Sequence, residues 1–194
     1  MTEDARALRE RTIEELKGEA RPVVIFGAGV VGEVLVAACH DLGIGVACVC
    51  DNDINKAGRV LRGVKVVHPS ELKAGYEDAA FVVSAADIRE VVDQLEALGC
   101  PRWYAASSLL GAGEVTRCDF SAPPDFVAYA VSTCVLCQES YLAPDRVFLR
   151  SVDLIITERC SLKCRDCSNL MQYYADPRDC SIDELSESIG ALGA

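Results

Sequence analysis

Three cysteines near the C-terminal end of the chain have the spacing of a metal-binding loop. Cys160, Cys164 and Cys167 form a C-x3-C-x2-C pattern directly after the apolar run 152–156. The run is rich in β-branched residues and predicts a buried strand that ends at Thr157, with the thiols on the loop that follows. In α/β folds ligands bind at that edge of the sheet. Three thiolates can hold three irons of a [4Fe–4S] cluster and leave the fourth iron open to bind and activate a substrate.

The segment from 152 to about 174 resembles the cluster loop of the radical S-adenosylmethionine (SAM) superfamily. The resemblance implies that Cys160, Cys164 and Cys167 ligate the cluster and that the open iron holds the amino and carboxylate groups of SAM. It further implies an external electron donor, whose electron passes through the cluster and splits SAM to a 5′-deoxyadenosyl radical. The substrate and the catalytic side chains stay unidentified. The segment departs from the family at Asp166, where an aromatic residue that contacts the adenine is common.

Other interpretations of these cysteines remain open. Positions 160, 164 and 167 would also share one face of a helix, as a buried stripe of thiols, although the residues between them are polar. A structural zinc site would need Cys180 or an upstream cysteine as its fourth ligand. A thiol-based redox sensor is a third possibility. The C-x2-C pair Cys134 and Cys137 lies in a predicted apolar helix, which favours a packing role for it.

A second motif precedes a predicted helix near the start of the chain. Gly27, Gly29 and Gly32 form G-x-G-x-x-G after the apolar run 22–26, and a second apolar run ends at Asp51. In a dinucleotide-binding turn the first glycine permits the tight bend, the second lets phosphates approach, and the third lets helix and strand pack closely. Asp51 is at the position from which an acidic side chain would accept a hydrogen bond from a ribose hydroxyl. The alternative is a scaffold whose glycines only make the turn and bind nothing.

The continuation of this region narrows the expected ligand. The segments D-N-D at 51–53, K-A-G at 56–58 and G-V-K-V at 63–66 resemble the N-terminal domains of sugar O-acyltransferases and nucleotide-sugar dehydratases, over residues 22–105. The resemblance implies a UDP-sugar, NAD(P) or no ligand at all.

Composition limits the partners that the chain could bind. The 194 residues are 51% apolar and 25% charged, with a net charge of −11 and 11 cysteines. The acidic balance argues against nucleic acid and anionic membranes and does not by itself identify a partner. Small-molecule ligands are the partners that the two resemblances imply. No stretch has the length of a signal peptide core or a membrane span. We therefore predict a cytoplasmic protein, in which clustered thiols more often bind metal than form disulfides.

The order of the predicted elements gives an α/β fold with four parts. Helix 1–20 precedes a Rossmann-like, doubly wound parallel sheet over 21–110, in which five strands alternate with helical segments. A linker with a helix spans 111–150, and 151–194 holds the first strand and helix of a radical SAM (β/α) barrel. Capping boxes are expected at Asp87–Glu90 and Ser181–Glu184. Because a barrel needs several more strand–helix units, we expect these 194 residues to be inactive alone, and a separate chain could supply the missing half.

Overall fold

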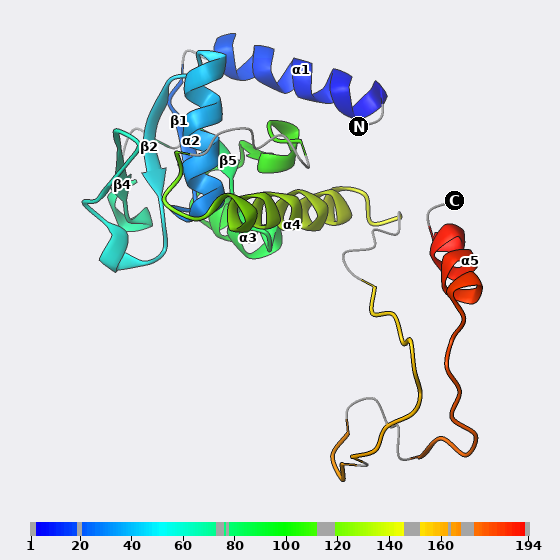
Figure 1. The fold of residues 1–194 in the computed structure, drawn as a ribbon. Coiled ribbons are helices and arrows are strands. Elements are labelled where there is room, and N and C mark those ends of the chain that lie inside the picture. Colours follow the sequence, from blue (N-terminus) through cyan, green and yellow to red (C-terminus); the bar gives the residue numbers. More distant parts are fainter. Residues whose placement is uncertain are drawn as a thin grey trace. The chain divides into compact units, whose positions relative to one another are not determined.

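The computed structural model describes residues 3–18, 21–72, 76, 78–111, 119–145, 152–162, 164–167 and 173–192. The chain divides into two compact units, Met1–Arg150 and Ser151–Ala194. The first unit is a mixed α/β fold built on one six-stranded sheet, and the second contains a long loop followed by a helix (Figure 1).

Parallel strands make up most of the sheet. Strands β1 (Val23–Phe26), β2 (Val46–Cys50), β4 (Val64–Val67), β5 (Ala80–Val83) and β6 (Trp103–Ala105) run in one direction, in the order β4-β2-β1-β5-β6. Strand β3 (Val60–Leu61) adds an antiparallel edge to β4. The predicted α/β architecture with five parallel strands is therefore confirmed, and β3 is an element that the sequence did not predict.

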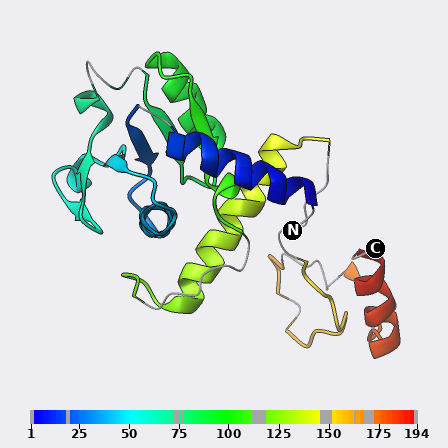
Figure 2. The same ribbon diagram turned by 90° about the horizontal axis from the view of Figure 1, so that it is seen from above.

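Helices cover both faces of the sheet because each central strand is apolar on both sides. In β1, Val23 and Ile25 belong to one core cluster, which also holds side chains from α1 (Glu3–Gly18), α2 (Val30–Leu42) and α4 (Pro124–Leu142). Val24 and Phe26 belong to a second cluster, which α3 (Ile88–Ala97) completes. Figure 2 shows α2 end-on and α3 on opposite sides of β1. This arrangement follows from the alternation of side chains along a strand.

Helix α3 begins where the sequence predicted, but the expected capping box at its start is wrong. Asp87 is the N-cap residue, and its side chain makes no capping hydrogen bond. The backbone of Asp87, at φ −84° and ψ 85°, differs from the extended geometry typical of a capping residue. The carboxylate of Asp87 is consequently not used by its own helix.

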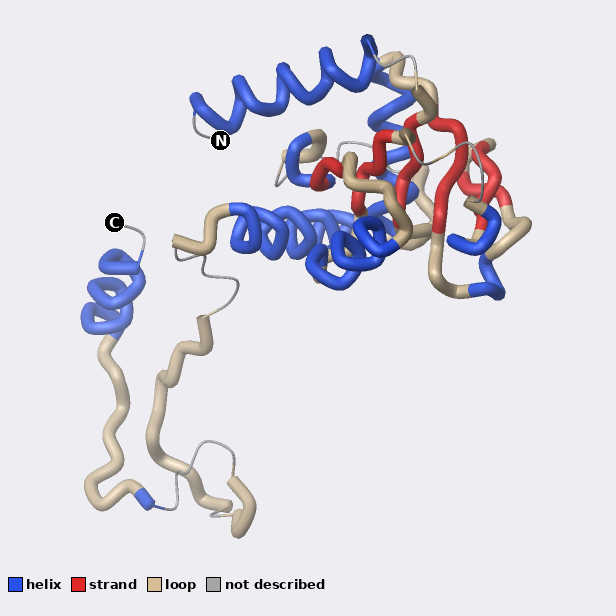
Figure 3. Tube along the Cα trace, turned by 180° about the vertical axis from the view of Figure 1, so that it is seen from behind, coloured by secondary structure: helices blue, strands red, loops and turns tan. Residues whose placement is uncertain are grey.

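The second unit differs from its predicted strand and helix in one respect. The run 152–156 is irregular chain, and its apolar side chains are 44–62% exposed, so the buried strand expected there is wrong. Thr157 makes a single antiparallel bridge to Asp179. A strand forms only where a neighbour pairs with its backbone groups, and the described part of this unit supplies no more than that bridge. The tube in Figure 3 shows loop over this stretch.

The helix of the second unit is present. Helix α5 (Ile182–Leu192) begins after Ser181. The Ser181 Oγ accepts a hydrogen bond from the Glu184 N–H at 3.2 Å, and the Glu184 carboxylate accepts one from the Ser181 N–H at 2.8 Å. The predicted capping box is confirmed. Of the helices in the described ranges, none is long and apolar enough to cross a membrane.

Candidate functional site

The turn between β1 and α2 depends on two glycines that leave no room for a side chain. Gly27 has φ +112°, and a Cβ there would meet the Ser84 hydroxyl, which donates to the carbonyl oxygens of Phe26 at 2.9 Å and Gly27 at 3.0 Å. A Cβ on Gly32 would lie less than 3.0 Å from the Gly27 carbonyl oxygen. The first and third glycines of the motif therefore allow a tight bend and close packing of α2 on it.

The second glycine faces open space. Gly29 is the N-cap of α2, with extended backbone at φ −101° and ψ −167° and no side-chain cap, and a Cβ at this position would have nothing within 4 Å. The first N–H groups of a helix have no intrahelical partner and point outward from its N-terminus. An open surface over such N–H groups is the arrangement that accepts a phosphate.

Asp51 lies beside this turn, at the end of β2. Its carboxylate accepts hydrogen bonds from the Ala28 N–H at 2.7 Å and the Asp53 N–H at 2.8 Å, and pairs with the Lys56 ammonium at 2.9 Å. Burial alone would raise the pKa of Asp51, but the hydrogen bonds from Lys56, Asp53 and Ala28 outweigh it and lower the pKa. The ionised carboxylate thus ties the end of β2 to the glycine turn.

An ionic network that the sequence did not predict is centred on the buried Glu33, which lies on α2 one residue after the motif. The Glu33 carboxylate is 6% exposed and accepts hydrogen bonds from the N–H and hydroxyl of Ser121. The Arg62 guanidinium lies 3.6 Å from Glu33, pairs with Asp119 at 2.6 Å and lies over the Phe120 ring. The hydrogen bond that the Arg62 guanidinium donates to the Asp119 carboxylate raises the pKa of Arg62. These contacts fix the segment before α4 against α2.

Helix α4 packs against the segments that follow β5 and β6, through a side chain that bonds to both. The fully buried Gln138 amide donates to the carbonyl oxygens of Val83 and Ala85, at 2.9 and 2.8 Å, and accepts from the Ser107 N–H at 3.0 Å. One turn earlier, the Cys134 thiol lies 3.4 Å from the Ser84 carbonyl oxygen. Helix α4 is consequently part of the same edge of the sheet as the glycine turn.

The described residues of the cysteine loop form turns and irregular chain, not a helix. The helical stripe of buried thiols is therefore wrong. Cys164 is exposed, and Cys160 and Cys167 are half-buried. Among the described residues, no group of three or more His, Cys, Asp or Glu side chains converges as a ligand set, so the structure does not bring these thiols together, with or without Cys180.

The two ends of the cysteine loop are held to each other by a set of contacts that we call the loop stem, formed by residues 156–159 and 178–180. The Thr157 hydroxyl donates to Asp179 at 2.6 Å, and Arg159 pairs with Asp179 at 3.3 Å. Backbone N–H groups of Glu158 and Cys180 donate to the Arg178 and Ile156 carbonyl oxygens, each at 2.9 Å. The stem closes the loop at its base, and it leaves Cys160, Cys164 and Cys167 on the enclosed segment.

Most described thiols of the first unit lie inside its apolar cores. Burial raises the pKa of Cys39, Cys50 and Cys134 to about 12. Thiols in this state are neither nucleophiles nor metal ligands near neutral pH, because both roles need the thiolate. Five thiols of the first unit are at most 4% exposed: Cys39, Cys48, Cys50, Cys100 and Cys134.

One comparison with known proteins bears on the first unit. Residues 19–102 match the N-terminal domain of the C2185-like family. The matched segment holds the sheet from β1 to β5 and helix α3, with the glycine turn and Asp51, and it ends before β6, α4 and the cysteine loop. The description of that family names no ligand or activity. No curated protein and no solved structure matches the chain.

Proposed function

We propose that Cys160, Cys164 and Cys167 bind a [4Fe–4S] cluster of the radical SAM type, as their spacing predicts. The observation that carries the proposal is the separation of the thiols into two classes. Five described thiols of the first unit are sealed in apolar cores and Cys137 is half-buried on α4, whereas the three at metal-binding spacing lie together on a solvent-accessible loop closed by its own stem. The donor set is suited to iron, since thiolates are the usual ligands of iron–sulfur clusters.

The residues of this loop have separable roles in the proposal. The three thiolates would ligate iron, and Arg159 and Arg165 beside them would offset the negative charge of the cluster. Arg159 is also held by Asp179, so it contributes to the loop stem as well. When bound, a cluster with one open iron supplies the electron that cleaves SAM to methionine and a 5′-deoxyadenosyl radical.

Metal analysis of the full chain tests this proposal. After anaerobic purification and reconstitution with iron and sulfide, we expect about four irons and four acid-labile sulfides per chain. Addition of SAM should change the electron paramagnetic resonance spectrum of the reduced cluster, because an open iron accepts a new ligand. Zinc at about one ion per chain, without sulfide, would instead support the structural zinc site.

We also propose that the first unit is a Rossmann-like module that binds a nucleotide, either a UDP-sugar or NAD(P). A specific observation favours it: the three glycines occupy the three different environments that a phosphate-binding turn requires. Gly27 and Gly32 are confined by neighbouring atoms, and Gly29 alone of the three faces open space at the N-terminus of α2. A scaffold that only needed the turn would have no requirement for the open position.

Calorimetric titration with UDP, a UDP-sugar and NADH tests the nucleotide proposal. We expect Gly29→Leu to abolish binding, because the backbone of Gly29 accepts any residue and the side chain would fill the phosphate approach. Gly45→Leu is the matched control. Gly45 is also exposed, with open space around a Cβ, but it precedes β2, at the end of that strand opposite to Asp51 and the glycine turn. Unchanged affinity in Gly29→Leu would favour the scaffold that binds nothing.

A further inference from the structure

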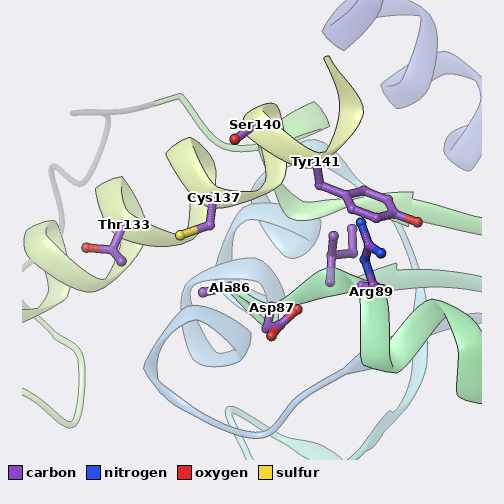
Figure 4. Close-up of a pocket in the computed structure, with 8 residues that line it drawn as sticks. Ala86, Asp87, Arg89, Thr133, Cys137, Ser140 and Tyr141 are labelled. Carbon is purple, nitrogen blue, oxygen red and sulfur yellow. The ribbon is translucent and has the colours of Figure 1, made fainter. Parts of the chain in front are cut away.

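A hollow of about 380 Å³ lies between the start of α3 and one side of α4. Figure 4 shows Ala86, Asp87 and Arg89 from the α3 side facing Cys137 and Tyr141 from α4. The hollow is at the carboxyl end of β5, the neighbour of β1, so the turn after β5 lies next to the glycine turn after β1. The Ser84 hydroxyl donates a hydrogen bond to the Gly27 carbonyl oxygen and so links the two turns directly.

Two side chains of opposite charge are available in this hollow. The Asp87 carboxylate makes no hydrogen bond to its own helix and no ion pair with the described residues around it. The Arg89 guanidinium lies over the Tyr141 ring, 5.6 Å from its centroid, and has no carboxylate partner within the described ranges. This cation–π contact leaves the N–H groups of the guanidinium able to donate to an anion. Tyr141 is itself supported by Trp103, at 6.5 Å between ring centroids.

The chemistry of this pair defines the ligand. A carboxylate accepts hydrogen bonds from hydroxyl groups, and a guanidinium donates to phosphate oxygens. A ligand that satisfies both has hydroxyl groups next to a phosphate, as the sugar and β-phosphate of a nucleoside-diphosphate sugar do. The nicotinamide ribose of NAD(P) also has hydroxyl groups next to a phosphate, but it has fewer of them than the hexose of a nucleoside-diphosphate sugar can present to a carboxylate.

From these observations we infer that the hollow between α3 and α4 is the subsite for the sugar of a nucleoside-diphosphate sugar, with Asp87 on the sugar hydroxyls and Arg89 on the β-phosphate. The inference rests on the proposed nucleotide-binding function of the glycine turn, which would hold the rest of the ligand. It makes α4, which lies outside the matched family domain, a part of the binding site.

Titration of the full chain with UMP, UDP, and UDP-glucose or UDP-N-acetylglucosamine, whichever binds more tightly, tests the inference. We expect Asp87→Asn to weaken UDP-sugar binding by about tenfold and leave UDP affinity unchanged, because UDP has no sugar at this position. Arg89→Ala should weaken UDP and the UDP-sugar equally and leave UMP unchanged. Asp93→Asn is the matched control, an exposed aspartate on α3 outside the hollow.

The outcomes separate the inference from the function on which it rests. If UDP and the UDP-sugar bind the wild-type chain and Asp87→Asn leaves both affinities unchanged, the sugar subsite is wrong and nucleotide binding stands. If NADH binds and the uridine nucleotides do not, the subsite is also wrong and nucleotide binding again stands. If no nucleotide binds, both proposals fail. Asp87→Asn should fold normally, since the carboxylate makes no capping hydrogen bond.

Discussion

Replacing Cys164 with alanine should reduce the iron and sulfide content of the reconstituted chain to background. Cys164 is the central thiol of the predicted ligand set and the only exposed one of the three. Its removal would leave two protein ligands where a cluster with an open iron requires three. The substitution should not unfold the chain, because an exposed side chain on a loop contributes little to stability. Iron and sulfide analysis, with the visible absorbance of the cluster, measures the effect.

Two further cysteine variants make this result specific. Cys137→Ala should retain the full cluster, because Cys137 is on α4 and belongs to the first unit. Cys180→Ala should also retain it, whereas a zinc site with Cys180 as the fourth ligand would be lost in both Cys164→Ala and Cys180→Ala. Equal loss of iron from Cys137→Ala and Cys164→Ala would show that the metal site has been assigned to the wrong thiols.

The parallel sheet could be predicted because its central strands are buried on both faces. Such strands are continuous apolar runs, and all four residues of β1 and of β5 are buried. Runs of this kind identify the strands. The helical pattern or turn that follows each run indicates that the next strand is parallel to it. The same kind of run predicted a strand at 152–156, and there the prediction was wrong. An apolar run indicates that a segment tends to be buried, but a strand also needs a neighbouring strand to pair with.

Strand β3 was missed because its turn does not have the usual sequence. Arg62 and Gly63, with φ +48° and +86°, join β3 to β4 in a two-residue hairpin. Both central residues of this turn need positive φ, for which Asn-Gly is the usual signal. An arginine in this conformation costs about 1 kcal/mol, which its contacts with Asp119, Glu33 and Phe120 can offset. Asp119 and Phe120 are distant in sequence, so no local pattern could predict them.

The candidate sites divide in a similar way. The spacing of the glycines and of Asp51 predicted that they lie at the same edge of the sheet, because both follow strands that are close together in the sequence. The bonds of Asp51 to Ala28 and Lys56, and the position of α4 over that edge, come from contacts between elements. For the cysteine loop, sequence gives the donors and their order. The loop stem could not be predicted in this way, because it depends on contacts between residues 156–159 and 178–180 that only the three-dimensional structure reveals.

The second large effect is expected from Gly32→Ala, which should destabilise the first unit by about 2 kcal/mol or more. Alanine in a helix is favoured over glycine by about 1 kcal/mol, so helix propensity alone predicts a gain. The added Cβ would, however, lie less than 3.0 Å from the Gly27 carbonyl oxygen, a backbone atom held in a turn that Ser84 also bonds. Relieving that overlap requires α2 to move away from β1, at a cost of about 3 kcal/mol or more. The overlap therefore outweighs the propensity.

Urea denaturation followed by tryptophan fluorescence measures this effect cleanly. The chain has a single tryptophan, Trp103 in β6, so the signal reports the first unit alone. Gly29→Ala is the matched control in the same motif. We expect its stability to stay within about 1 kcal/mol of wild type, because nothing lies near a Cβ at that position and alanine is only a poorer N-cap residue than glycine. A Gly32→Ala variant as stable as Gly29→Ala would mean that α2 does not pack closely on the glycine turn. The motif would then lack the close packing that is needed to bring a phosphate to the N-terminus of α2.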